Sequence, residues 1–191
     1  KMLIEKGCSY DEFYENLGFI KKKFRSLQDA GCYDLLYTSA RDLYHTTVNC
    51  YSGTGVEHIV RSEYGEALRL KGLVREAWDV VGAISLENIY DISEMDRCDI
   101  EHLISKVYFV NGKYKECLEM EKKVYEQRKA ILGENHQDTL NTMNNLAVFY
   151  KAIGEKQKAL EMEKIVYEIR KAILGENHPD TLNTMNNLAV F

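Results

Sequence analysis

The 191-residue sequence is poor in proline, with a single residue of this type, and it has only twelve glycines. That is too little turn punctuation for a fold of many short strands. No apolar run approaches the roughly 20 residues that a membrane helix requires, and the segment from Met2 to Ile4 is too short for a signal-peptide core. We therefore expect an all-α protein with no membrane partner.

The sequence also lacks an excess of basic residues. Its 25 basic and 30 acidic side chains give a net charge of −5. A general nucleic-acid binder usually shows a basic face, so we expect no nucleic-acid partner.

Paired cysteines are absent too. An odd number of cysteines with no CxxC pair predicts neither a disulfide framework nor a four-thiolate zinc site. The cysteines are Cys8, Cys32, Cys50, Cys98 and Cys117. Reduced thiols are typical of the cytoplasm, where we expect this protein to be found.

Motifs for catalysis are missing as well. The sequence has no GxxxxGK[ST], HExxH or GxSxG segment, so we expect no enzyme, no catalytic residues and no cofactor. His136 and His178 lie in matching linkers without a second ligand three or four residues away. The pattern predicts loop structure there, with no metal site.

What the sequence does contain is a repeat. The segment 117–149 recurs, 42 positions later, as 159–191. The two copies differ at four places, which are Cys117/Ala159, Lys123/Ile165, Gln127/Ile169 and Gln137/Pro179. A unit of this length is too short to be a domain, so it indicates a stacked array that buries its apolar faces between neighbours. A binding scaffold is the function class that such an array favours.

Glycines set the phase of the array. Gly31, Gly72, Gly112 and Gly154 are 41, 40 and 42 residues apart, and a small residue follows the last three after five positions. Glycine suits the end of a helix because it adopts a positive φ at little cost. Each unit is thus predicted to be a helix pair, with the glycine ending the first helix.

This register divides the chain into five segments. They are a degenerate helix pair acting as cap or docking unit (1–55), a divergent unit (56–95), two regular units (96–135 and 136–177) and an orphan first helix acting as a C-terminal lid (178–191). The lid is expected to pack on a second helix over 156–174, because its apolar side chains have no other partner. Those side chains are Leu182, Met185, Leu188 and Ala189. Because the chain stops within a repeat, we expect a fragment of a larger protein.

The motif NNLAxxYxxxG, a small residue five positions later, and an extended second helix ending in LGENHPDTLNTMNNLA resemble the long-repeat tetratricopeptide units of kinesin light chain. The resemblance is strong over 96–191 and weak over 1–95. HEAT and armadillo repeats have a similar length but lack this glycine and small-residue pattern. The resemblance implies a right-handed α-solenoid of stacked antiparallel helix pairs, whose concave groove holds a peptide or partner helix.

The resemblance also implies groove positions on the first helix of each unit. The candidates are Asn141, Asn144, Asn145, Lys151, Asn183, Asn187, Lys106 and Arg69. Carboxamides suit this role because they both donate to and accept from an extended peptide backbone. The alternative is that the asparagines bridge neighbouring helices, and Leu103 interrupts the polar series in the third unit. Replacing Asn145 and Asn187 by alanine is expected to weaken ligand binding without altering melting.

One basic cluster stands out. Lys21, Lys22 and Arg25 would attract an acidic peptide if their helix faced the groove, or they form a solvated face.

Three functions remain open at this point. The first is a scaffold that binds a protein or peptide ligand. The second is a sensor arm that regulates a catalytic domain, such as an NTPase or protease, outside this fragment. The third is self-association, because near-identical units offer the same surface to a second chain.

Overall fold

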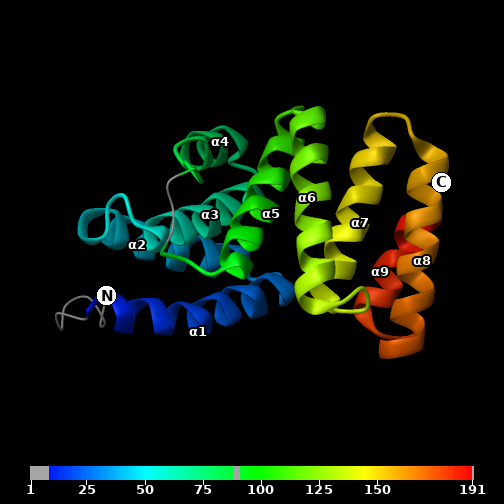
Figure 1. The fold of residues 1–191 in the computed structure, drawn as a ribbon, viewed down its shortest axis with the longest axis horizontal. Helices are drawn as coiled ribbons and strands as arrows, with labels where there is room; N and C mark the ends of the chain where they lie inside the picture. Colours follow the sequence, from blue (N-terminus) through cyan, green and yellow to red (C-terminus); the bar gives the residue numbers. More distant parts are fainter. Residues whose placement is uncertain (1–8, 88–90, 191) are drawn as a thin grey trace. The chain divides into compact units, whose positions relative to one another are not determined.

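The structure is a computed structural model that describes residues 9–87 and 91–190, and these ranges contain nine α-helices and no strands (Figure 1). The helices are α1 (Tyr10–Asp29), α2 (Tyr33–Cys50), α3 (Gly55–Leu70), α4 (Val74–Gly82), α5 (Glu94–Val110), α6 (Tyr114–Leu132), α7 (Gln137–Ala152), α8 (Lys156–Leu174) and α9 (Pro179–Leu188). The all-α fold class is confirmed. Residues 1–8 of the predicted cap and Phe191 of the predicted lid lie outside the described residues. None of the described helices combines the length and apolar character needed to cross a bilayer.

The glycine turns are confirmed. Gly154 has φ of 91°, a left-handed conformation that a side chain would strain. Its N–H donates to the Lys151 carbonyl at 3.1 Å, and the next N–H, from Glu155, donates to the Tyr150 carbonyl at 2.9 Å. These bonds close the end of α7 and allow α8 to run back beside it. The other three phase-marking glycines also have positive φ.

Small residues lie where the paired helices approach each other. Ala77, Cys117 and Ala159, each five positions after a turn glycine, are completely buried. This confirms the prediction that the position requires a small side chain.

The chain divides into two compact units, which we call unit 1 (up to Asn111) and unit 2 (from Gly112). The division falls between α5 and α6, inside the segment 96–135 that the sequence assigned to one repeat.

Unit 2 is a regular stack. The helices α6, α7 and α8 lie side by side, and α9 packs along α8 (Figure 1). Its core contains Leu140 and Met143 from α7 and Val166 from α8. Partly buried side chains from α6 and α8 complete this core, namely Tyr125, Met162 and Ile169.

The last helix packs against α8 as predicted, but the reason given for this packing is wrong. The side chains that α9 buries are Thr181 and Thr184, whereas Leu182 and Met185 remain 38% and 43% exposed. The equivalent Leu140 and Met143 are only 1% and 7% exposed. The difference arises because α7 packs closely between α6 and α8, while α9 packs closely along α8 and meets α7 through side-chain hydrogen bonds such as that of Asn187 to Asn144.

Unit 1 is built around α3. This helix packs against α2, α4 and α5, and twelve of its residues are buried. Aromatic side chains pack between these helices. The ring of Tyr44 in α2 stacks on that of Tyr64 in α3 with a centroid distance of 4.9 Å, and the rings of Trp78 in α4 and Tyr108 in α5 are 5.0 Å apart. Most faces of α3 are therefore covered by protein.

Candidate functional site in unit 2

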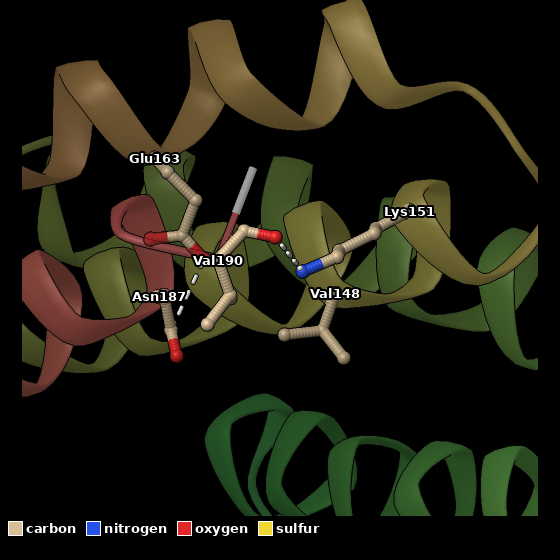
Figure 2. Close-up of a pocket in the computed structure, with 5 residues that line it drawn as sticks. All are labelled: Val148, Lys151, Glu163, Asn187 and Val190. Carbon is tan, nitrogen blue, oxygen red and sulfur yellow. Dashed lines mark hydrogen bonds between the residues drawn. The ribbon is translucent and has the colours of Figure 1, made fainter.

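A pocket of about 220 Å³ opens in unit 2, among α7, α8 and α9 (Figure 2). Val148 and Lys151 reach it from α7, Glu163 from α8 and Asn187 from α9, while Val190 follows the end of α9. Val148 and Lys151 lie three residues apart, which places them on one face of their helix. The pocket thus combines two apolar walls with a cation, a carboxamide and a carboxyl group.

Lys151 binds a main-chain carbonyl in this pocket. Its ammonium donates a hydrogen bond of 3.2 Å to the carbonyl oxygen of Val190 (Figure 2). Residues 189 and 190 form a turn beyond α9, so this carbonyl belongs to non-helical backbone. The Lys151 ammonium therefore already binds one main-chain carbonyl, that of a turn at the end of α9.

Glu163 is the buried acid of the pocket. The Asn187 side-chain amide donates to one of its carboxyl oxygens at 3.2 Å, and the other oxygen has no hydrogen-bond partner. Burial raises the pKa of Glu163 to about 7, although the Asn187 bond opposes the shift. The group is thus partly protonated near neutrality. Figure 2 shows the Asn187 oxygen directed away from Glu163.

The same acid and amide recur one repeat earlier. There the Asn145 amide donates to the buried Glu121 at 3.4 Å. The bond therefore joins the second helix of one repeat to the first helix of the next, α6 to α7 and α8 to α9. It has a structural role within the stack.

A buried arginine reinforces each of these junctions. Arg170 donates to the Thr184 hydroxyl at 2.7 Å, and Arg128 donates to Thr142 at 2.8 Å. Each also donates to a main-chain carbonyl of the next helix at 3.3 Å. Charged donors that satisfy buried acceptors in this way fix the relative register of the helices.

The two linker histidines cap helices. The Nδ1 atoms of His136 and His178 accept from the N–H groups of Asp138 and Asp180, each at 3.2 Å. Across residues 9–87 and 91–190, no three His, Cys, Asp or Glu side chains group as a metal site would require.

Comparison with known proteins assigns the repeats. Residues 96–172 match the family model described as tetratricopeptide repeat. This segment is a tetratricopeptide array. A search of curated proteins returns no match.

Solved structures agree on the fold of these tetratricopeptide repeats. Two crystal structures of a Podosopora anserina protein, assigned as a kinesin light chain with nearly identical TPR-like repeats, are 22% identical. They have TM-scores of 0.66 and 0.65, and the match covers 88% of this chain and 81% and 82% of theirs. BtubC (BKLC) from P. vanneervenii is 17% identical, with a TM-score of 0.53 over 83% of this chain and 62% of that one. The predicted resemblance and the helical repeat solenoid are confirmed.

The tetratricopeptide groove residues predicted in unit 2 are only partly at the pocket. Lys151 and Asn187 line it, and Asn144 accepts a hydrogen bond of 3.1 Å from Asn187. Asn141 lies apart from the lining and accepts from Arg170 at 2.6 Å, whereas Asn183 is exposed. Asn141, Asn144 and Asn187 thus bond to neighbouring helices in this structure, whereas no such bond is seen for Asn183.

The groove residues predicted in unit 1 form an ion cluster. Arg69 and Lys106 both bond to the buried carboxylate of Glu66, at 2.6 and 2.5 Å. Burial opposes the charge of Glu66, but Lys106 and Arg69 outweigh it and lower its pKa to about 2. These two cations are engaged with a carboxylate of their own unit.

The predicted basic cluster is divided by the fold. Lys21 bonds to Asp96 and Asp99 at the start of α5, while Lys22 and Arg25 are exposed. Burial disfavours the Lys21 charge, yet the two carboxylates outweigh it and raise the pKa of Lys21. Lys21 is therefore part of an internal ion pair, and its charge does not add to a surface patch with Lys22.

Sequence reasoning missed Glu163 and Val190. A signal for the first was present, because Glu121 and Glu163 are acids at the same position in the buried stripe of their helices. Val190 gave no signal, since its counterpart Val148 lies inside a helix that continues to Ala152.

Proposed function

We propose that this tetratricopeptide array is a protein interaction scaffold that binds an extended peptide at the pocket of unit 2. The bond between the Lys151 ammonium and the Val190 carbonyl carries the proposal. An extended peptide presents the same kind of acceptor at regular intervals. In the complex, a main-chain carbonyl of the peptide accepts the hydrogen bond from Lys151 in place of the Val190 carbonyl.

The walls of the pocket support this function. Val148 and Val190 provide apolar surface for a side chain of the ligand, and the Asn187 oxygen provides an acceptor for a peptide N–H. Main-chain contacts of this type give affinity without reading every side chain. We therefore expect the pocket to select peptides that carry an apolar side chain next to the carbonyl that Lys151 binds.

Lys151 is a sharper probe of the site than the asparagines. Asn145 and Asn187 both bond to buried glutamates, so each replacement by alanine removes a hydrogen bond from a buried carboxyl group. Such a loss costs about 1 to 3 kcal/mol. We now expect the double asparagine variant to melt at a lower temperature, which would confuse a binding test.

The experiment begins with random twelve-residue peptides displayed on phage and selected against the chain. The affinity of a selected peptide is then measured by fluorescence anisotropy for three proteins, the original chain, Lys151→Ala and Lys164→Ala. Lys164 lies on the exposed face of α8 and is the charge-matched control. We expect Lys151→Ala to weaken binding about tenfold, the loss of one charge-assisted hydrogen bond. Equal affinities for the three proteins would refute the assignment of the pocket.

Self-association is a second candidate function. Leu182 and Met185 are partly exposed on α9, although the same residues of α7 are covered. A second copy that covered them would bury apolar area at no cost in new polar groups. Sedimentation equilibrium tests this: a dimer that Leu182→Glu with Met185→Glu abolishes supports it, and a monomer at all concentrations excludes it.

A further inference from the structure

The groove positions of unit 1 are covered. Ile59, Ser62 and Glu66 of α3 precede the turn glycine Gly72 by thirteen, ten and six residues, where the tetratricopeptide resemblance implies ligand contacts, and all three are buried. Side chains of α1 reach past α3 to the segment 91–99, at the start of α5. Tyr14 donates to Asp96 at 2.7 Å and accepts from the Ser93 N–H at 3.1 Å.

Further bonds join α1 to the same segment. The Lys21 ammonium donates to Asp96 at 3.0 Å and to Asp99 at 2.5 Å, and the Tyr10 hydroxyl donates to Asp91. Tyr10, Tyr14 and Lys21 follow one another at spacings of four and seven residues, which places them on one face of α1. Together they bind the three aspartates Asp91, Asp96 and Asp99.

The surface that α1 contacts is acidic. Besides the three aspartates it includes Glu63 of α3, whose pKa burial raises to about 7, with Asp99 and Glu66 adding to the shift and Lys21 opposing it. The nearby cations Arg69 and Lys106 are both engaged by Glu66. Helix α1 therefore supplies cations that balance this surface, Lys21 by direct bonds to Asp96 and Asp99 and Arg25 by its charge near Glu63.

Helix α1 buries fewer side chains than α3 does. Only three of its twenty residues are buried apolar side chains, namely Phe13, Leu17 and Phe24. The side chains of Lys21, Asp96 and Asp99 are 17 to 20% exposed, so water and salt reach the ion pairs. A helix with few buried apolar contacts opens at a lower free energy than a central helix such as α3.

We propose that the acidic surface formed by Glu63, Asp91, Asp96 and Asp99 is a second binding surface, which accepts a basic, tyrosine-bearing helix of a partner protein. In the structure, α1 is the intramolecular segment that occupies it. The partner helix replaces α1 by placing a cation between Asp96 and Asp99 and tyrosine hydroxyls on Asp91 and Asp96. A helix that offers a cation and tyrosine hydroxyls differs in chemistry from the extended peptide proposed for the pocket of unit 2, so the two proposals can be tested separately.

The test uses the full chain and a fluorescent peptide of residues 9–31 as the probe. Lys21→Ala weakens α1 in the chain, so we expect it to bind the probe at least about tenfold more tightly than the original chain does. The control Lys23→Ala removes an exposed charge of the same helix and should bind the probe as the original chain does. Tyr14→Phe removes two hydrogen bonds without a change of charge, and we expect a smaller increase in the same direction.

A second set of variants identifies the surface. Asp96→Asn with Asp99→Asn, added to Lys21→Ala, should cancel the gain in affinity, and a probe carrying Lys21→Glu should not bind. Hydrogen exchange should show the amides of α1 exchanging faster than those of α3. Failure of the Lys21→Ala chain to bind the probe, or equal binding after the aspartate changes, would overturn the proposal. Dimerisation of that chain without probe binding would also overturn it, in favour of α1 exchange between copies.

Discussion

Leu140 and Leu182 occupy the same position of two nearly identical segments, TLNTMNNLAVF, yet the structure buries the first and half exposes the second. Leu140 contacts a core of Met143 and Val166, whereas Leu182 has one side open to solvent. We predict that Leu140→Ala destabilises the protein far more than Leu182→Ala does.

The magnitudes follow from burial. The change to alanine removes three carbons, worth about 2.4 kcal/mol at about 0.8 kcal/mol each, and the enclosed cavity at Leu140 adds about 1 kcal/mol. We expect about 3 kcal/mol for Leu140→Ala. Leu182 is 38% exposed, so its transfer contribution is about 1.5 kcal/mol, and no closed cavity forms. Because α9 can unfold while the rest of the stack stays folded, the global transition should shift by less than about 1 kcal/mol.

The assay is urea unfolding followed by far-ultraviolet circular dichroism, with hydrogen exchange to measure the local stability of α9. Repeat arrays can unfold in stages, so the two variants are compared by midpoint and by slope. Equal shifts for the two variants would refute the argument. If the shift of Leu182→Ala also grew with protein concentration, a second copy would be covering α9.

Four further outcomes are expected. Glu163 has a pKa of about 7 in the folded chain and about 4.5 when unfolded, so its contribution to stability is greatest below pH 4.5 and is lost as the pH rises to 7. Glu163→Gln should flatten this part of a plot of Tm against pH, and an unchanged plot would contradict the assigned pKa. Gly154→Ala, at φ of 91°, should cost about 1 kcal/mol or more in chemical denaturation. Gly18→Ala, within α1 where an added Cβ meets nothing within 4 Å, should instead stabilise that helix by about 0.5 to 1 kcal/mol, measured by hydrogen exchange of α1. Raising the salt concentration should speed exchange of the α1 amides, because the Lys21 ion pairs are reached by solvent, and unchanged exchange would show that apolar contacts hold α1.

The sequence by itself determined the elements of this fold. Helix propensity, the repeat of 42 residues and the turn glycines placed α8 at Lys156–Leu174 and began α9 at Pro179, as the structure has them. These features depend on local backbone preferences and on a short, regular period, which a single chain displays directly. The tetratricopeptide type was predicted separately, from the resemblance of the motif NNLAxxYxxxG and of the segment LGENHPDTLNTMNNLA to that family.

The candidate site could be predicted only in part. Lys151 and Asn187 stood at positions given by the resemblance, but whether an asparagine faces a ligand or a buried glutamate depends on the neighbouring helix. Lys21 looked like part of a basic surface because its partners, Asp96 and Asp99, lie 75 and 78 residues away in the sequence. No local pattern predicts such a pairing.

Sequence therefore determined the limits of α8 and the position of the glycine turns, because those depend on residues close to each other in the chain. Tertiary structure alone decided which copies of the same residues are covered. Leu140 and Leu182 are identical in sequence context and differ only in whether a helix lies on each side. The free energy of an apolar or charged side chain depends on what surrounds it, and that is set by helices distant in the sequence.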